Sequence, residues 1–174
     1  MFKIFKPKMY YKDIFSVNYE LLKEKGIKCL LFDLDNTIEP IIIPLPDDED
    51  IAFFNKLKGM GFKVIIMSNG YKERVTKFAK KLKVDVIYFS LKPFVKSYLT
   101  MMYKYHLKPK EIAAIGDQLV TDIWGANNAK ITSIFVDRIC DIEKKGTKIN
   151  RFFEKLILNY FQKHNMFEKG NYYE

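Results

Sequence analysis

Short, unbroken apolar runs alternate with amphipathic stretches along most of this chain. An unbroken run is typical of a strand covered on both faces, whereas apolar positions three and four residues apart indicate a helix with one buried face. The predicted strands cover residues 28–33, 63–67, 85–89, 111–116 and 131–136. Predicted helices cover residues 11–26, 49–59 and 71–83, segments beginning at Pro93 and near Thr121, and residues 148–163.

This alternation predicts an α/β fold of the doubly wound, Rossmann-like type. Five parallel strands would form one sheet, with helices on both faces and right-handed crossovers. The 174 residues suit a single domain, 1–174. Within it we expect an N-terminal tail and helix (1–27), a core (28–136), and a C-terminal amphipathic helix and tail (137–174).

Polar side chains follow the first four predicted strands at the point where each strand ends. The carboxyl ends of parallel strands share one edge of a sheet, and ligands bind there, at a point where the strand order reverses. One acid at such an end means little, but a lysine, a hydroxyl and several acids together indicate a phosphate site. The residues, in chain order, are Asp33, Asp35, Ser68, Asn69, Lys92, Asp117 and Asp122.

The chemistry of these groups favours a metal-dependent reaction on phosphate over a solvated turn. Asp33, Asp117 and a backbone carbonyl offer hard oxygens that suit Mg²⁺, and the cation would relieve repulsion among clustered carboxylates. Lys92 and Ser68 would complete a cradle for phosphate oxygens. One carboxylate can act as a nucleophile, and another two residues away, Asp35, can act as general acid and then base.

The charge balance limits the classes of partner that this protein is expected to bind. The net charge is +9, and only Arg74, Arg138 and Arg151 among the basic residues are arginine. Proteins that read nucleic-acid sequence rely on the bidentate fork of arginine, so this composition argues against that class. The lysines suit solvated faces, anionic membrane surfaces or anionic substrates.

Nothing in the sequence predicts a membrane span or a secretory signal, because no apolar run approaches the length of either. Cys29 and Cys140 have no metal-binding spacing and are interpreted as reduced thiols. We therefore expect a cytoplasmic protein, with a peripheral position at the inner face of the membrane as the alternative.

The motifs D-L-D-N-T, S-N, K-P and G-D-Q-L-V-T-D resemble the four motifs of the haloacid-dehalogenase (HAD) superfamily phosphatases. The resemblance implies that Asp33 is the nucleophile and Asp35 the acid and base. It implies that Ser68 binds the phosphoryl group and Lys92 balances its charge. Asn69 and Thr37 are predicted to bind substrate, with Thr37 also supporting the loop. The implied Mg²⁺ ligands are Asp33, Asp35 through its carbonyl, Asp117 and Asp122, the last directly or through water.

More narrowly, the chain resembles the YqeG-type subfamily (IIIA), which is related to the mitochondrial phosphatidylglycerophosphate phosphatases. Only 32 residues separate Asp35 from Ser68, and 23 separate Ser68 from Lys92. A helix and a strand fill most of each gap, so neither can hold a cap domain. An open site suits a phosphate presented by something large, since pockets for small metabolites bury most of the ligand.

Three functions stay open on these grounds. The preferred one is a phosphatidylglycerophosphate phosphatase of phospholipid biosynthesis that forms an aspartyl-phosphate. The second is a phosphatase for soluble or macromolecular phosphate monoesters, and the third a non-catalytic module that binds anions or RNA. A receiver domain shares the sheet and the lysine, but Asp35 favours hydrolysis. The oligomeric state is not predicted.

Three segments have two interpretations each. Residues 41–43, all isoleucine, would pack or flex, or would form an apolar lip at the site. Residues 1–11 would be a packed or disordered tail, or a membrane-surface anchor. The apolar face of the helix over 148–163 would pack on the core or touch a membrane. That face comprises Ile149, Phe152, Phe153, Leu156, Ile157, Tyr160 and Phe161.

Overall fold

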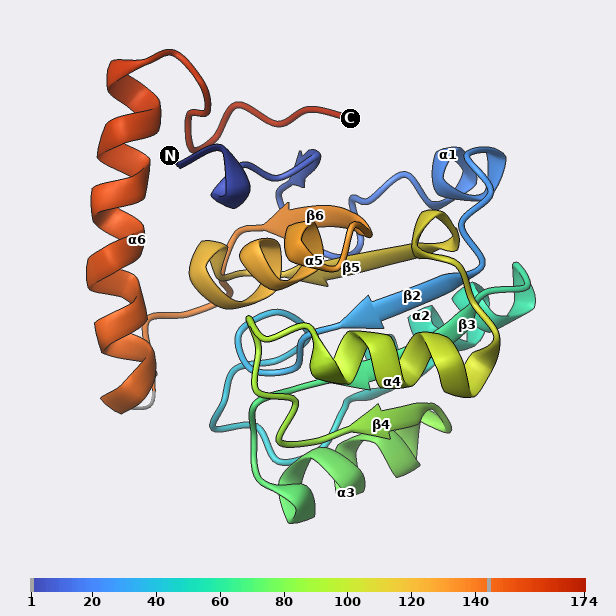
Figure 1. Ribbon diagram of the computed structural model, residues 1–174. Helices are drawn as coiled ribbons and strands as arrows, with labels where there is room; N and C mark the ends of the chain where they lie inside the picture. The colour runs from blue at the N-terminus through green and yellow to red at the C-terminus, as the bar shows by residue number, and fades with distance from the viewer. Residues whose placement is uncertain (1, 144) are drawn as a thin grey trace.

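Six parallel strands form the sheet of the computed structural model, which describes residues 2–143 and 145–174 (Figure 1). The strand order is β1-β6-β5-β2-β3-β4. This confirms the doubly wound α/β class. The strands are β1 (Met9–Tyr11), β2 (Cys29–Phe32), β3 (Lys63–Met67), β4 (Asp85–Ile87), β5 (Ile112–Gly116) and β6 (Thr132–Val136).

Helices cover both faces of this sheet. Helices α1, α2 and α3 share one buried cluster with the strands, and α4 and α5 share another. The α-helices are α1 (Tyr19–Glu24), α2 (Asp48–Gly59), α3 (Lys72–Leu82), α4 (Lys96–Tyr105), α5 (Trp124–Asn128) and α6 (Lys145–Lys163). Short turns of other helix types are η1 (Phe2–Phe5), η2 (Pro109–Glu111) and η3 (Leu119–Ile123).

The N-terminal segment corrects two predictions. The sheet has six strands rather than five, because Met9–Tyr11 pairs with Ile134–Val136 of β6. The predicted helix over 11–26 is reduced to Tyr19–Glu24. The tail is packed: Tyr10 is fully buried, and it exchanges backbone hydrogen bonds with Tyr173, which covers part of the free edge of β1.

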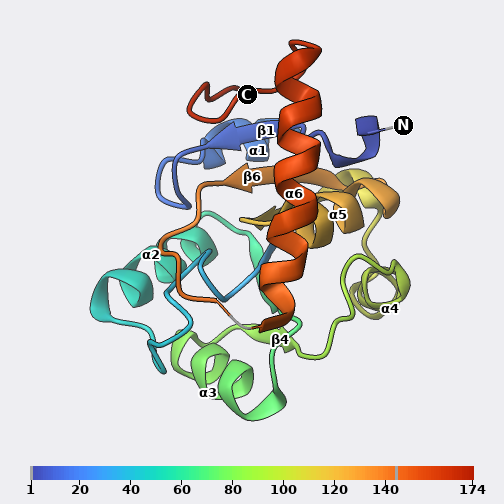
Figure 2. The ribbon, with the colours of Figure 1, turned by 90° about the vertical axis from the view of Figure 1, so that its left-hand side faces the viewer.

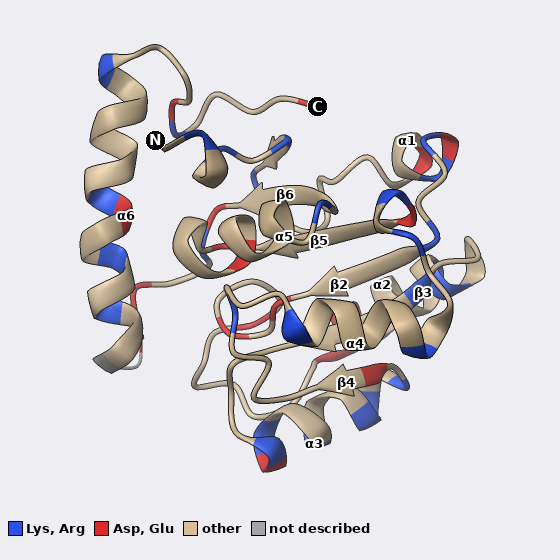
Figure 3. Ribbon diagram, in the orientation of Figure 1, with Lys and Arg blue, Asp and Glu red and all other residues tan. Residues whose placement is uncertain are grey.

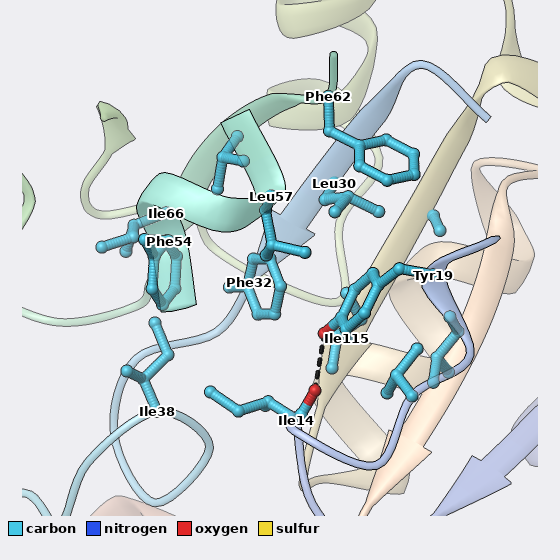
Figure 4. Close-up of a cluster of buried hydrophobic side chains, with 14 of the residues drawn as sticks. Ile14, Tyr19, Leu30, Phe32, Ile38, Phe54, Leu57, Phe62, Ile66 and Ile115 are labelled. Atoms are coloured by element: carbon cyan, nitrogen blue, oxygen red, sulfur yellow. Dashed lines mark hydrogen bonds between the residues drawn. The ribbon is translucent and has the colours of Figure 1, made fainter. Parts of the chain in front are cut away.

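Alternation along β2 explains its unbroken apolar run. Leu30 and Phe32 point to the face covered by α1, α2 and α3, whereas Cys29 and Leu31 point to the other face. Figure 4 shows Phe32 between Phe54 and the segment around Tyr19, with the Tyr19 hydroxyl donating a hydrogen bond to the Ile14 carbonyl at 2.7 Å. Both faces of β2 are therefore dry, and its carboxyl end is held rigidly.

β2 also marks the point where the strand order reverses. The chain runs from β2 outward through β3 to β4, and then returns to the other side of β2 through β5 and β6. Loops after β2 and β5 consequently diverge, which leaves a crevice at their carboxyl ends. Asp33 and Asp117 directly follow these two strands.

Helix α6 stands across the carboxyl edge of the sheet (Figures 1 and 2). Its apolar residues are divided between two environments. Ile157 and Phe161 are buried in a cluster with Tyr10, Phe135 and Phe167. Four others are exposed, namely Ile149, Phe152, Phe153 and Leu156. No described helix is long and apolar enough to cross a membrane.

The amino end of α2 contains a buried acid. Asp47 caps the helix by accepting a hydrogen bond from the Asp50 backbone N–H at 2.9 Å. The Asp50 carboxyl lies within 4.8 Å of carboxylate oxygens of Glu39 and Asp47. Burial raises the pKa of Asp50 from 3.8 to about 7, and the two neighbouring carboxylates raise it as well.

Asp50→Asn is expected to remove a pH-dependent loss of stability. A carboxyl whose pKa is higher in the folded state holds its proton there, so its ionisation opposes folding as pH rises from about 4 to about 7. Urea unfolding at about pH 5 and about pH 8 should show the variant gaining stability relative to wild type at the higher value. An equal difference at both values would contradict the buried, protonated carboxyl.

Candidate active site

Three carboxylates and one lysine meet beyond the carboxyl ends of β2, β4 and β5. The Lys92 Nζ lies 2.6 Å from an Asp33 oxygen and 2.6 Å from an Asp122 oxygen, and it donates to the Met67 carbonyl at 2.8 Å. Its three N–H donors thus have three acceptors. The ammonium group fixes both carboxylates and ties them to the end of β3.

Asp117 is held by a cation from the far end of the chain. The Arg151 guanidinium of α6 donates to the Asp117 carboxylate and, at 2.8 Å, to the Asp117 carbonyl. The same group donates to Glu143 and Glu154, each at 2.6 Å. Glu154 in turn accepts a hydrogen bond from the Leu119 backbone N–H at 2.7 Å. Helix α6 is therefore joined directly to the acid that ends β5.

Thr37 lies beneath the acids instead of in the pocket lining. Its hydroxyl oxygen is 3.1 Å from an Asp117 oxygen and 3.4 Å from an Asp33 oxygen, and the residue is 2% exposed. One hydroxyl proton serves one acceptor at a time, and the shorter distance favours Asp117. Thr37 thus connects the loop after β2 to the end of β5; its predicted contact with substrate stays a prediction.

Asp35 turns away from Lys92 and toward a second arginine. Its Oδ1 accepts hydrogen bonds from Arg74 Nε at 3.0 Å and Nη2 at 2.8 Å. Arg74 also donates to the Ile43 carbonyl at 2.5 Å, which holds the loop between β2 and α2 beside α3. The two acids of D-L-D-N-T therefore have different cationic partners.

Ser68 and Asn69 follow β3 and line the pocket. The Ser68 oxygen accepts a hydrogen bond from the Gly70 N–H at 2.9 Å, which leaves the hydroxyl proton for a ligand. Asn69 joins its neighbours, since its side-chain oxygen accepts from the Lys92 N–H and the Ser90 hydroxyl and its amide donates to the Lys92 carbonyl. Its predicted contact with substrate also stays a prediction.

The hollow above these groups is small, with a volume of about 90 Å³, and it opens to solvent. Ile41 supplies part of its wall from the loop after β2. Glu143, Thr147 and Asn150 supply another part, from α6 and the segment before it. No cap domain is inserted between the strands in the described residues, and the first turns of α6 form a pocket wall that the sequence did not predict.

Gly116 shows how tightly the floor is built. A Cβ at this position would clash with the Asp122 side chain, at 2.6 Å from its Cβ and one of its carboxylate oxygens. Asp122 occupies that space because its Oδ2 accepts the Gln118 N–H at 3.2 Å while its Oδ1 meets Lys92. Glycine is therefore required where β5 ends.

Negative charge exceeds positive charge among the ion-paired groups. Burial raises the pKa of Asp33 above its usual range, the Lys92 ammonium opposes that rise, and the nearby carboxylates add to it. Burial likewise raises the pKa of Asp117 to about 6, partly offset by Arg151. The six carboxylates are Asp33, Asp35, Asp117, Asp122, Glu143 and Glu154, and the four cations paired with them are Lys92, Arg74, Arg151 and Arg138.

A divalent cation would suit this imbalance. Asp33, Asp117 and Asp122 are buried and place one carboxylate oxygen each within 4.8 Å of the others. Oxygen donors of this kind are the ligands of Mg²⁺. The structure thus brings together three of the four predicted metal ligands through their side chains, while the Asp35 side chain points to Arg74.

Sequence reasoning missed Arg74, Arg151 and the pocket residues of α6. One signal was available: the chain has only three arginines among 30 basic residues. All three form ion pairs, with Asp35, with Asp117, and in the case of Arg138 with Asp141 and Glu143. Arginine matches a carboxylate with a planar fork, so a rare arginine marks such a contact better than an abundant lysine does.

The fold and this arrangement of strand-end acids and lysine define a phosphatase of the haloacid-dehalogenase type. The family model described as mitochondrial PGP phosphatase matches residues 2–139. A relative from Bacillus subtilis (strain 168), described as the probable phosphatase YqeG, is 34% identical over 157 residues, which are 90% of this chain and 91% of the relative. The chain belongs to the mitochondrial PGP phosphatase family.

Solved structures share the fold at low identity. An uncharacterized protein from Listeria monocytogenes serotype 4b has a TM-score of 0.54 and 15% identity, covering 75% of this chain and 98% of its own. The D,D-heptose 1,7-bisphosphate phosphatase from B. bronchiseptica, solved with magnesium and phosphate, has a TM-score of 0.51 and 15% identity, covering 63% and 80%. These likenesses support the fold class.

Arg151→Met should lower the free energy of unfolding by about 3 kcal/mol, because it leaves buried carboxylates without their cation. Arg138→Met is the matched control: its guanidinium is 37% exposed, against 14% for Arg151, and its loss should cost about 1 kcal/mol or less. Chemical denaturation without added metal measures both. Equal losses would show that the Arg151 network does not hold α6.

Proposed function

We propose that this phosphatase hydrolyses phosphate monoesters through an aspartyl-phosphate on Asp33, with Mg²⁺ bound. The observation that carries the proposal is the position of Asp33, which lines the open pocket, contacts Lys92 and belongs to the cluster of three buried acids. The family assignment favours an enzyme over the non-catalytic anion- or RNA-binding module.

Asp33, Asp117 and Asp122, together with the Asp35 carbonyl, would hold the Mg²⁺ ion. When bound, the cation would neutralise phosphoryl oxygens and the surplus carboxylate charge. Lys92 keeps Asp33 and Asp122 in place, Thr37 supports Asp117, and Arg151 supports it from α6. These contacts orient the oxygens before a ligand arrives, which lowers the cost of reorganisation.

In the first step an Asp33 carboxylate oxygen would attack phosphorus as the bond to the ester oxygen breaks. Asp35, in its protonated form, would give its proton to the departing alkoxide. The Ser68 hydroxyl would bind a non-bridging oxygen, and the Lys92 ammonium, whose three donors are already engaged, would balance the charge of the phosphoryl group beside Asp33. The products of this step are the free alcohol and the acyl phosphate on Asp33.

In the second step Asp35, now a carboxylate, would take a proton from water as that water attacks phosphorus. The bond to Asp33 breaks, and inorganic phosphate and the original carboxylate are released. Arg74 would act on Asp35 as a positioning residue, since two of its donors meet one carboxylate oxygen.

The preferred substrate is the terminal phosphate of phosphatidylglycerophosphate. Support comes from the family and from the pocket, which opens to solvent without an inserted cap. Phosphorylated metabolites or macromolecules remain the second candidate. A net charge of +9 agrees with any of these anionic substrates and selects none. We place the protein in the cytoplasm, and a peripheral position at the inner face of the membrane is the alternative.

Asp33→Asn should abolish phosphate release while leaving the fold intact, because an amide of the same shape is a poor nucleophile. Malachite-green detection over a panel of lipid and soluble phosphate esters, with Mg²⁺ and with EDTA, would measure the effect. Wild-type turnover that persists in EDTA, or full activity of the variant, would refute the metal-dependent aspartyl-phosphate route.

Asp35→Asn should lower kcat by about two to four orders of magnitude, the usual contribution of general acid–base catalysis. Esters with good leaving groups need little protonation, so their first step should survive and phosphorylated protein should accumulate. Acid quenching followed by intact-mass spectrometry would detect the added phosphoryl group, and Asp33→Asn supplies the blank. No accumulation with any ester would argue against a separate role for Asp35.

The substrate is tested by comparing phosphatidylglycerophosphate in mixed vesicles with soluble esters at equal phosphate concentration. We expect a higher kcat/KM for the lipid. Equal or faster hydrolysis of soluble esters at low concentration would assign the enzyme to the second candidate function.

A further inference from the structure

Exposed apolar side chains gather at the edge of the sheet that holds the pocket. Because all six strands are parallel, every loop that follows a strand leaves from this one edge. The loop after β3 carries Tyr71, which is 71% exposed. Between β4 and α4 the chain exposes Phe89, Leu91 and Phe94.

The segment after β6 continues this pattern beside the catalytic loop. Ile139 and Ile142 are both exposed. The Ile139 N–H donates to the Asn36 carbonyl at 3.1 Å, and the Asn36 side chain donates to the Ile142 carbonyl at 2.9 Å. Asn36 itself lines the pocket, so these two isoleucines are attached to its rim.

Helix α6 adds a stripe of exposed apolar side chains to this edge. Ile149, Phe152, Phe153 and Leu156 recur at helical spacing, and about half or more of each side chain is exposed. Asn150 and Arg151, on the opposite side of the helix, face the pocket and Asp117. Figure 2, which looks toward this edge, shows the helix standing in front of the sheet.

The other edge of the sheet lacks this feature. Its turns cover residues 25–28, 59–62, 83–84, 106–111 and 129–131. None of the large apolar side chains exposed in the described chain lies in these turns. The asymmetry is not a general property of this surface, since isolated exposed apolar residues would be scattered over both edges.

We propose that this apolar rim, comprising the α6 stripe and the exposed apolar residues of the loops after β3, β4 and β6, docks on an anionic lipid bilayer. Apolar side chains would enter the boundary between headgroups and acyl chains, while lysines remain among the headgroups. Lys148 and Lys155 lie on one flank of the stripe, and Figure 3 shows basic bands along α6.

Charge favours a bilayer over a second copy of this chain. Each molecule carries a net charge of +9, so two copies would repel each other. An anionic membrane attracts a protein of net positive charge, and a fluid bilayer does not require the rim to have a complementary shape. Docking would place the mouth of the pocket against lipid headgroups. That consequence for the substrate rests on the proposed function, whereas binding to the membrane does not.

The test uses the full chain and vesicles of phosphatidylcholine with about 30% phosphatidylglycerol, a composition chosen for its anionic surface. Co-sedimentation would compare wild type with the Phe152→Ser/Phe153→Ser double variant. Removing two exposed aromatic rings that would enter the bilayer should weaken binding at least about tenfold. Leu99→Ser/Tyr103→Ser, on the exposed face of α4, is the matched control and should bind as wild type does.

Hydrolysis of a soluble ester and thermal unfolding show that each variant is folded, because none of the four positions lies in the pocket. Wild-type protein that does not sediment with anionic vesicles would overturn the proposal. Equal weakening in both double variants would do the same. A dimer in sedimentation velocity that Phe152→Ser/Phe153→Ser dissociates, without vesicle binding, would assign the rim to self-association instead.

Lipid hydrolysis separates this inference from the proposed function. If both hold, Phe152→Ser/Phe153→Ser should raise KM for vesicle-borne phosphatidylglycerophosphate about tenfold and leave kcat unchanged. Vesicle binding through the rim without lipid hydrolysis would support docking and refute the substrate. If both double variants hydrolyse the lipid as fast as wild type does, the result would support the lipid substrate and refute docking through the rim.

Discussion

The structure depends on the compensation of buried carboxylates at the end of the central strand. Asp33, Asp117 and Asp122 converge because β2 and β5 are neighbours and the chain reverses direction across the sheet between them. Without cations these groups would repel one another, because all three side chains are buried and little water reaches them to screen their charges. Lys92 compensates part of this negative charge, because its ammonium group donates to two of the carboxylates and to the Met67 carbonyl. The charge that remains is what makes the site suited to a divalent cation.

Two arginines extend this compensation outward and connect the site to elements distant in sequence. Arg74 holds Asp35 and the loop carrying Ile41, while Arg151 holds Asp117 and brings α6 against the pocket. The amino end of α6 thus forms part of the pocket wall, and its inward and outward faces have different roles. The inward face supports an acid, and the outward face displays apolar side chains beside the pocket mouth.

Prediction from sequence succeeded where a local pattern has one structural outcome. Apolar runs bounded by polar residues located five of the six strands, and parallel topology then required their following acids, hydroxyl and lysine to meet at one edge. It failed for Met9–Tyr11, because only three apolar residues lie there between Lys8 and Lys12, whereas the apolar run that marks β4 continues over residues 86–89. The predicted helix before β2 was also too long. Ile14 and Val17 lie in a loop that packs on the core, so their apolar character does not indicate a helix there.

The sequence by itself determined the order of strands and helices and the identity of the groups at each strand end. These follow from side-chain periodicity and from the geometry that every parallel sheet shares. Only the tertiary structure decided which cation meets which acid, because Arg151 and Asp117 are joined by folding and not by spacing. It also decided which side of α6 is buried. That helix has apolar residues on both sides, so its pattern could not distinguish the side that packs from the side that remains exposed.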